Sequence, residues 1–479
     1  MEDQKRIPLY QALIKHTKNK PISFHVPGHK NGQIFQHEAN EFYQPFLEMD
    51  VTELSGLDDL HSPEGVIREG EQLLASLYNV KQSFFLVNGS TVGNLAMIMA
   101  SCRENDTVLV QRNCHKSVVN AIKLAKARPI FLEPEFNPIW KVAANVSLDT
   151  VKKAICLYPE AKALILTYPN YYGMVYDIKG LISHAHLHDI PVLVDEAHGA
   201  HFIIDDPFPS SAVSLGADAV VQSAHKTLPA MTMGSYLHIN SDRINLGKLK
   251  DYLQILQSSS PSYPIMASLD LARQYLAMYE GKDINYLIEE VNYFRQELKQ
   301  IPSINVLEYP NSQGDQLKVT IQSRNELSGF ELQKRFEQKG IYTELADTNN
   351  VLFIMPLLKE KQSYPHRLAL EKIKSVLANL PLHFSTEEVP ISREKIKGLA
   401  IPYELMFSLE VSDVPITDAV DTVCAETIIP YPPGVPLLLK GELITDIAVK
   451  QLNALMKSGA RFQGGSSLDR ELIKVFWTR

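Results

Sequence analysis

The segment Ser223-Ala224-His225-Lys226-Thr227 follows a short apolar run, Ala219–Gln222, and so places a lysine directly after a predicted strand. An earlier run, Val192–Asp195, ends in a carboxylate, which is costly to bury without a cationic partner. Taken alone, Asp195 could cap the following helix, and most lysines in loops are solvated charges. Together the two segments predict a site at strand ends.

Similar runs alternate with longer helical stretches through the first half of the chain. Strands are predicted at Phe84–Val87, Thr107–Val110, Ile130–Leu132, Leu164–Thr167, Val192–Asp195, Ala219–Gln222 and Ser235–Ile239. Repeated strand-then-helix order predicts an α/β fold with a mostly parallel sheet covered on both faces. In such sheets, ligands bind at the carboxyl ends of the strands.

The rest of the chain is predicted to form a smaller α+β domain and a C-terminal domain. We place boundaries at 1–62 (an irregular N-terminal segment with one short helix), 63–264 (large domain), 265–382 (bridging helix and small domain), 383–397 (linker) and 398–479 (C-terminal domain). Further helices are predicted at Leu9–Lys15, Pro63–Tyr78, Ile265–Ile301, Gly329–Lys339 and His366–Leu380, and further strands at Leu317–Ile321 and Val351–Met355.

Composition argues for a packed protein with small-molecule partners. The chain has 479 residues, 47 Lys and Arg against 55 Asp and Glu, and a net charge of −8, so nucleic acid and anionic membrane are not expected as partners. We expect no membrane span, because polar residues interrupt the most apolar window, Phe84–Cys102. Four scattered cysteines without a C-x-x-C motif, and an N-terminus without an apolar signal core, predict a cytoplasmic protein.

The lysine and the carboxylate are the pair that pyridoxal phosphate requires. A lysine holds this cofactor as a Schiff base, and a carboxylate keeps the pyridine nitrogen protonated so that the ring accepts electrons. Lys226 and Asp195 are the candidates for these two roles. A protonated pyridine nitrogen would also compensate the buried charge of Asp195.

Two further elements fit a planar phosphorylated cofactor. The turn Asn88-Gly89-Ser90-Thr91 lies between a predicted strand and a predicted helix, where backbone amides and hydroxyls can bind a phosphate. An ordinary capping turn explains it equally well. His115 follows the Thr107–Val110 strand and could stack on the ring, although a lone histidine is more often structural.

Two rival interpretations are weaker. Asp195-Glu196-Ala197-His198 resembles a nucleotide-binding Walker B box, but the chain has no G-x-x-x-x-G-K-[ST] loop before it. A metal site built from the histidines between 184 and 201 lacks an H-E-x-x-H motif, so no metal is expected.

Motifs along the whole chain resemble those of the Orn/Lys/Arg decarboxylases with the aspartate-aminotransferase fold, in particular the short members without an N-terminal wing domain. The motifs are His25-Val26-Pro27-Gly28-His29-Lys30, Leu57-Asp58-Asp59-Leu60-His61-Ser62-Pro63-Glu64-Gly65, Cys114-His115-Lys116-Ser117, Asp195-Glu196-Ala197-His198-Gly199-Ala200-His201, Ser223-Ala224-His225-Lys226 and Tyr431-Pro432-Pro433-Gly434-Val435-Pro436 followed by Gly441-Glu442.

The resemblance implies roles for individual residues. Lys226 and Asp195 bind the cofactor as described above, His115 stacks on its ring, and His198 lies beside its phenolic oxygen as a further catalytic group. Phosphate ligands are Ser90, Thr91, Ser223, His225 and, from a neighbouring subunit, Ser260. Substrate contacts are Glu426, Asp58 and His61. Some relatives have Gly-Thr-Ser where this chain has Gly89-Ser90-Thr91, which leaves the ligand assignment open at that turn.

We therefore expect a homodimer with shared active sites that decarboxylates a basic amino acid for polyamine metabolism. Arginine, giving agmatine, is favoured over lysine and ornithine. An aminotransferase of the same fold is an alternative, because Arg324, Arg335 and Arg367 could bind a substrate carboxylate. A non-catalytic or regulatory homologue that binds pyridoxal phosphate or a partner is a second alternative, disfavoured by the intact set Lys226, Asp195 and His115.

Overall fold

A computed structural model describes residues 3–204, 206–310, 313–378, 380, 382, 394–430 and 435–477. The chain forms two compact units. The first comprises Met1–Ser101 and Pro191–Glu280, and the second comprises Cys102–Ile190 and Gly281–Arg479. The domain boundaries expected from the sequence divide the chain differently and stay predictions.

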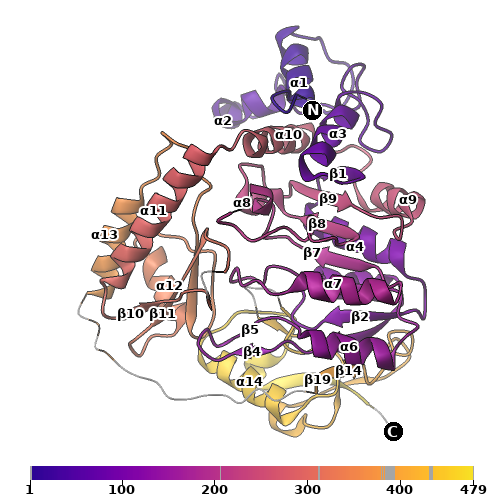
Figure 1. The fold of residues 1–479 in the computed structure, drawn as a ribbon, viewed down its shortest axis with the longest axis vertical. Helices are drawn as coiled ribbons and strands as arrows, with labels where there is room; N and C mark the ends of the chain where they lie inside the picture. Colours follow the sequence, from indigo (N-terminus) through magenta and orange to yellow (C-terminus); the bar gives the residue numbers. More distant parts are fainter. Residues whose placement is uncertain are drawn as a thin grey trace. The chain divides into compact units, whose positions relative to one another are not determined.

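Four strands of the first unit form a continuous part of a sheet (Figure 1). Their order is β1 (Gln82–Leu86), β9 (Ser235–Ile239), β8 (Ala219–Gln222) and β7 (Val192–Asp195). β7 and β8 are parallel, whereas β9 runs antiparallel to both β8 and β1. The strands are almost completely buried, as expected for a sheet covered on both faces.

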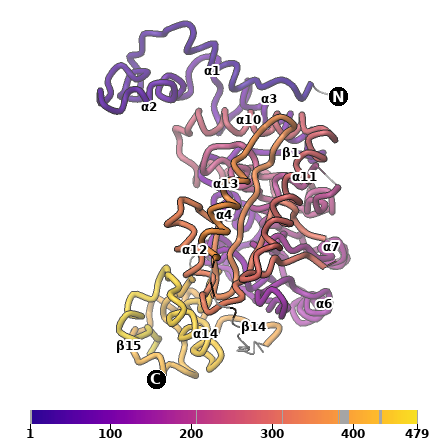
Figure 2. The backbone as a smooth tube through the Cα atoms, turned by 90° about the vertical axis from the view of Figure 1, so that its left-hand side faces the viewer, coloured from indigo at the N-terminus to yellow at the C-terminus, as the bar shows by residue number. Residues whose placement is uncertain are grey.

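Seven α-helices belong to the described part of this unit: α1 (Pro8–Lys18), α2 (His37–Leu47), α3 (Val66–Tyr78), α4 (Gly89–Ser101), α8 (Ala224–Thr227), α9 (Leu246–Leu256) and α10 (Tyr263–Ala277). α1 lies beside α3 and α10 (Figure 2), and buried Asp270 of α10 accepts a hydrogen bond from the Leu9 N–H. The prediction of only one short helix in the N-terminal segment was wrong, because this segment also contains α2. Pro45 inside α2 argues against a helix by sequence alone.

The second unit contributes β6 (Leu164–Thr167), β2 (Thr107–Gln111), β3 (Arg128–Leu132) and β14 (Ile396–Gly398), in this order. The first three strands are parallel, and β14 is antiparallel to β3. In sequence, α5 (Lys116–Leu124) lies between β2 and β3, α6 (Leu148–Leu157) precedes β6, and α7 (Ile178–Leu187) follows β6. β4 (Phe136–Asn137) pairs with β5 (Val142–Ala143). The predicted α/β architecture with a mostly parallel sheet is confirmed; the strands that run against their neighbours are β9 and β14, whereas β1, on the far side of β9, runs in the same direction as β8.

A smaller antiparallel sheet follows in the same unit. It consists of β10 (Ile304–Val306), β11 (Lys318–Ser323), β13 (Asn350–Ile354) and β12 (Leu345–Ala346), with helices α11 (Gly281–Lys299), α12 (Gly329–Glu337) and α13 (His366–Leu377). The single helix expected over Ile265–Ile301 was wrong. α10 ends at Ala277 and α11 begins at Gly281, a residue type that weakens a helix interior.

The C-terminal part has its own apolar core. The core lies between a three-stranded sheet of β15 (Val411–Pro415), β19 (Leu472–Phe476) and β16 (Val423–Cys424) and the helix α14 (Asp446–Lys457). β17 (Ile429–Pro430) pairs with β18 (Phe462–Gln463). Residues 431–434 of the proline-rich motif and 383–393 of the expected linker lie outside the described residues.

A buried ion pair links this C-terminal part to the parallel strands of the second unit. Arg112, which follows β2 and is 3% exposed, lies 2.8 Å from a carboxylate oxygen of Glu442. Its guanidinium also donates to the carbonyl oxygens of Pro436 and Leu437. Among the described residues, no helix is long and apolar enough to cross a membrane.

Candidate active site

Asp195 and Lys226 are carried to the same edge of the first unit's sheet. Asp195 is the last residue of β7 and pairs in register with Val221 of the parallel strand β8. β8 ends one residue later, and Lys226 lies in the short helix α8 that follows it. Carboxyl ends of neighbouring parallel strands meet at one edge, which is where α/β sheets bind ligands. The structure thus brings together the two segments on which the sequence prediction rests.

The carboxylate of Asp195 is buried and held by two donors. The side-chain amide of Asn94, on α4, donates to Oδ2 at 2.9 Å, and the Ala197 N–H donates to Oδ1 at 3.2 Å. Asp195 is 4% exposed and Asn94 is 1% exposed. Sequence reasoning missed Asn94. Its signal was a polar residue within the apolar run of α4, because buried polar groups are almost always hydrogen-bonded.

The amine of Lys226 meets a histidine. Nζ of Lys226 lies 3.1 Å from Nε2 of His198, within hydrogen-bonding distance. A protonated lysine can only donate, so it makes Nε2 of His198 the acceptor and leaves the imidazole proton on Nδ1. Lys226 is half-buried and His198 is 4% exposed. A buried imidazole and a lysine in contact form a pair that can exchange a proton.

Three of the predicted phosphate ligands, Ser90, Thr91 and Ser223, lie at the start of α4. Oγ of Ser223 donates to Oγ of Ser90 at 2.7 Å, so the hydroxyls of two distant segments lie side by side. Gly89 begins α4 with a φ of +74°, which glycine adopts without strain. Thr91 is exposed in the first turn. His225 is half-buried, and its Nδ1–H donates to the carbonyl oxygen of Gly234 at 3.0 Å.

Helix α4 approaches the sheet very closely one turn after these hydroxyls. A Cβ atom placed on Gly93 would lie 2.4 Å from Cγ2 of Val221 on β8 and 2.8 Å from Cδ1 of Leu86 on β1. Neither distance is possible for real atoms without a shift of these side chains, the helix or the strands. The missing side chain of Gly93 therefore allows α4 to pack in close contact with Val221 and Leu86.

Asp58, predicted to contact substrate, has a structural role in this structure. Its carboxylate accepts backbone hydrogen bonds at the start of α3 from Glu64, Gly65, Ile67 and Arg68. Burial by itself would raise the pKa of Asp58, but these backbone N–H groups outweigh it and lower the pKa. The predicted substrate contact stays a prediction.

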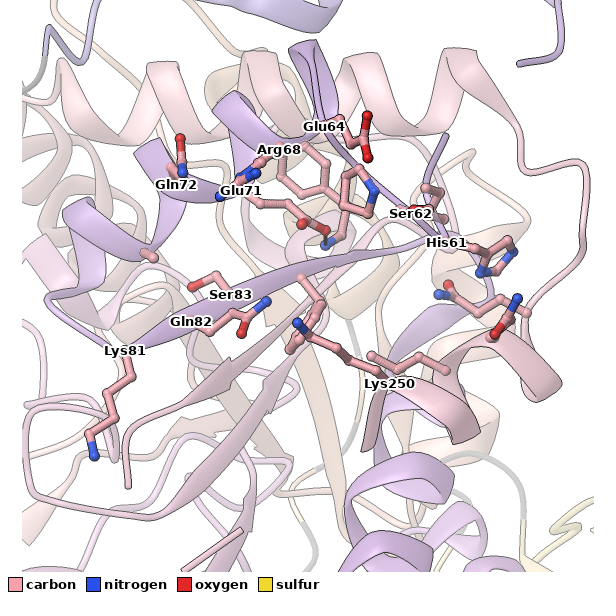
Figure 3. Close-up of a pocket in the computed structure, with 18 residues that line it drawn as sticks. His61, Ser62, Glu64, Arg68, Glu71, Gln72, Lys81, Gln82, Ser83 and Lys250 are labelled. Atoms are coloured by element: carbon pink, nitrogen blue, oxygen red, sulfur yellow. Dashed lines mark hydrogen bonds between the residues drawn. The ribbon is translucent and has the colours of Figure 1, made fainter. Parts of the chain in front are cut away.

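His61 lines a pocket of about 650 Å³ in the first unit. Its Nε2–H donates to the carbonyl oxygen of Ser258 at 2.8 Å, close to the exposed Ser260. Figure 3 shows the pocket between α3, which carries Glu71, β1, which carries Ser83, and α9, which carries Lys250. The lining of this pocket does not include Lys226 or Asp195, so the pocket and the lysine site are separate features.

Two predicted site residues belong to the second unit. His115 caps α5, where its Nδ1 accepts a hydrogen bond from the Ser117 N–H, so its remaining ring nitrogen carries the proton. Glu426 accepts a hydrogen bond from the Lys474 N–H through Oε1. Because Lys226 belongs to the other unit, the ring stacking of His115 and the substrate contact of Glu426 stay predictions.

The histidines of α7 show no metal-binding arrangement. The rings of His184 and His188 lie 5.1 Å apart in an edge-to-face contact. Within the described ranges, no group of three or more His, Cys, Asp or Glu residues is placed to hold a metal ion. All four cysteines lie in the described part of the chain and are thiols rather than disulfides.

Comparisons with known proteins identify relatives over nearly the whole chain. The family model described as Orn/Lys/Arg decarboxylase, major domain, matches residues 7–322, and the model of the C-terminal domain of the same family matches residues 399–467. An uncharacterised protein of Bacillus subtilis strain 168 is 45% identical, with 98% of both chains covered. A protein of Bacillus anthracis named arginine decarboxylase is 32% identical, with 98% of this chain and 97% of that protein covered.

Solved structures agree on the fold. The crystal structure of the Francisella novicida lysine decarboxylase matches with a TM-score of 0.79 at 20% identity, covering 98% of this chain and 81% of that chain. Serine palmitoyltransferase from Sphingomonas wittichii matches with a TM-score of 0.53 at 16% identity, covering 79% of this chain and 87% of that chain. At these identities the structural matches show the fold alone.

The family matches define a pyridoxal phosphate-dependent decarboxylase. Within that class, the chain belongs to the Orn/Lys/Arg decarboxylase family. The side chains of the first unit fit such a cofactor. They offer an amine for the aldehyde, a buried carboxylate fixed by Asn94 for the protonated ring nitrogen, and paired hydroxyls at a helix N-terminus for the phosphate.

Proposed function

We propose that this protein decarboxylates a basic L-amino acid at the site around Lys226, with arginine, converted to agmatine, as the favoured substrate. The observation that carries the proposal is the contact of Lys226 with His198 beside the buried pair Asp195 and Asn94. Family membership supports the reaction class. The name of the Bacillus anthracis relative supports arginine, whereas the lysine decarboxylase names of other relatives keep lysine as a second candidate.

Each candidate site residue of the first unit has a role in this proposal. Lys226 would hold the cofactor through its amine, Asp195 would face the ring nitrogen, and Ser90, Thr91, Ser223 and His225 would hold the phosphate. Pyridoxal phosphate, when bound, supplies a ring that accepts the electron pair released as carbon dioxide leaves. Asn94 fixes the carboxylate of Asp195, so that its negative charge stays aimed in one direction.

Proton transfer falls to Lys226 and His198. After carbon dioxide leaves, the α-carbon of the substrate needs one proton, which must come from a group at hydrogen-bonding distance. The 3.1 Å contact between Lys226 and His198 allows either side chain to give the proton and the other to replace it. The buried position of His198 limits exchange with bulk water.

The experiment that tests the function measures carbon dioxide and amine release by purified protein reconstituted with pyridoxal phosphate. Arginine, lysine and ornithine are supplied separately, with Lys226→Ala as the inactive variant and Lys152→Ala, an exposed lysine of α6, as the matched control. We expect agmatine from arginine, with loss of activity only in Lys226→Ala. A keto acid in place of an amine would establish the aminotransferase alternative, and a missing cofactor absorption band would establish a non-catalytic homologue.

We further propose that the active form is a homodimer with composite sites. The support is the exposed position of Ser260 in the loop after α9, where a second subunit could reach it. Mixing inactive Lys226→Ala subunits with Ser260→Ala subunits should restore about a quarter of wild-type activity or less, through the hybrids that keep one intact site. If the mixture shows only the sum of the two separate activities, Ser260 does not act across an interface.

A further inference from the structure

A second buried carboxylate lies next to Asp195, on the opposite face of the strand. Glu196 is 0% exposed and accepts three hydrogen bonds. Oε2 accepts from Oγ of Ser211 at 2.7 Å and from the side-chain amide of Gln222 at 2.6 Å, and Oε1 accepts from the Ala212 N–H at 2.6 Å. The Glu196 N–H donates to the Val221 carbonyl oxygen at 2.9 Å, which continues the pairing with β8 one residue beyond β7. Because successive side chains of extended backbone alternate, Asp195 and Glu196 face different sides of the sheet.

The three donors connect the segments that carry the candidate site. Glu196 directly follows Asp195, and Gln222 directly precedes the segment from Ser223 to Lys226. Ser211 and Ala212 close the loop that begins with His198. The carboxylate of Glu196 thus connects the backbone segments that carry Asp195, His198 and Lys226.

The hydrogen bonds continue beyond Gln222 in one direction. Oε1 of Gln222 lies 3.1 Å from Nε2 of His238, and Nδ1 of His238 lies 2.8 Å from Oγ of Ser83. Burial lowers the pKa of His238 to about 3, so the ring is neutral. Because the Gln222 amide N–H₂ donates to Glu196, its carbonyl oxygen must accept from Nε2–H of His238, and Nδ1 must accept from the Ser83 hydroxyl.

We propose that Glu196 is a positioning residue for the cofactor site, which sets the orientation of Asp195 and Lys226 from the opposite face of the sheet. The proposal rests on the proposed function for the identity of the cofactor. The carboxylate of Glu196 accepts from Ser211, Ala212 and Gln222. In the hydrogen-bond chain that ends at Glu196, Ser83 donates to His238, His238 donates to Gln222, and Gln222 donates to Glu196. Burial raises the pKa of Glu196 to about 7, although its three hydrogen bonds oppose the shift.

An amide in place of the carboxylate tests this role with little change of shape. In Glu196→Gln, the new N–H₂ group faces either the N–H₂ group of Gln222 or the N–H of Ala212, so two donors oppose each other in both orientations. Relief of the first arrangement requires the Gln222 amide to turn over and the His238 proton to move to Nδ1. In the double variant Glu196→Gln with Gln222→Glu, the new carboxylate accepts from both the new amide and His238 Nε2–H. The hydrogen bond between positions 196 and 222 is thus restored with its direction reversed, and His238 keeps its proton on Nε2.

A matched control exists on the same two strands. Asp218 is 0% exposed, lies at the opposite end of β8, and accepts a hydrogen bond from the Val192 N–H at the start of β7 at 2.7 Å. Asp218→Asn removes a buried charge that joins the same strands, away from the site. It controls for a general loss of stability.

The primary readouts do not depend on turnover. They are the dissociation constant of pyridoxal phosphate, the pH at which the visible band of the bound cofactor changes, and the melting temperature of the apoprotein. We expect Glu196→Gln to weaken cofactor binding by about tenfold or more, as for loss of a hydrogen bond to a charged group, and to shift the pH of the band change. Kinetically, kcat should fall more than KM rises.

The double variant should recover most of the cofactor affinity, and Asp218→Asn should lower the melting temperature while keeping the wild-type dissociation constant and band. If Glu196→Gln lowers the melting temperature but keeps wild-type cofactor affinity and spectrum, Glu196 is structural only and the proposal is overturned. The proposal is also overturned if the double variant is as impaired as the single one. Failure of the proposed function would instead appear as normal cofactor binding without amine release in the wild type.

Discussion

The side-chain nitrogen of Lys226 lies 3.1 Å from Nε2 of His198. The two residues come from segments that follow neighbouring parallel strands, β8 and β7, and the contact joins a half-buried amine to a buried imidazole. Only one proton can occupy the line between the two nitrogens. When Lys226 holds this proton, Nε2 of His198 is the acceptor, and when Nε2 holds it, the amine of Lys226 is the acceptor.

His198→Ala should lower kcat by about 10²- to 10⁴-fold, the usual contribution of a positioned proton donor, with a smaller effect on KM. His188→Ala, an exposed histidine at the end of α7, is the control and should behave as wild type. Steady-state amine release checks both variants. A change in KM alone would assign His198 to substrate binding.

Asn94→Ala should weaken pyridoxal phosphate binding by about tenfold, because Asp195 loses its 2.9 Å hydrogen bond. Asn94→Asp should be more damaging, since it places a second negative charge against the carboxylate. Fluorescence titration of the apoprotein with the cofactor measures both effects. Equal affinities for the two variants would show that the charge of Asp195 is not sensitive to this position.

Asp58→Ala should destabilise the protein by about 1 kcal/mol or more at neutral pH, as expected for loss of a helix-capping carboxylate. The pKa of Asp58 is lowered in the folded state, so its stabilising effect is present above its ordinary pKa and is lost as the pH falls below about 4. Chemical unfolding at several pH values checks this. The difference from wild type should shrink in acid, while Asp242→Ala, 94% exposed at its side chain, should show no such dependence.

Arg112→Met should leave the carboxylate of Glu442 buried without its cation and destabilise the second unit by about 3–5 kcal/mol. Arg112→Met combined with Glu442→Leu should recover part of this loss, because no uncompensated charge remains. Urea unfolding followed by tryptophan fluorescence is suitable, since buried Trp140 belongs to the same unit. A double variant less stable than Arg112→Met would show that Glu442 stabilises the fold through partners other than Arg112, such as the Leu439 N–H.

The strands of the large sheet could be predicted closely because they are short apolar runs bounded by polar turns. β6, β7, β8 and β9 have the bounds that the sequence predicts. The helix α2 could not be predicted from the sequence. Pro45 and exposed apolar residues such as Phe42, 75% exposed, do not follow the pattern of a helix packed on a core. The break between α10 and α11 interrupts an otherwise continuous helical pattern.

The candidate site divides in the same manner. Lys226 and Asp195 are visible in the sequence because their chemistry is specific and their positions follow apolar runs. The roles of Asn94 and Gln222 are not visible in the sequence. They depend on hydrogen bonds to Asp195 and Glu196, which are 101 and 26 residues away along the chain. A polar residue within an apolar run, such as Asn94, indicates a buried hydrogen bond, but only the folded chain shows which buried polar residue is its partner.

The absence of a side chain at Gly93 has a consequence for protein engineering. Directed changes to the phosphate turn are usually sought among the residues that touch the ligand. Here a single methyl group one turn further along the helix, in Gly93→Ala, would collide with side-chain atoms of Val221 and Leu86, so that these side chains or the start of α4 would have to shift. The most sensitive position for cofactor affinity can therefore be one that no cofactor atom touches.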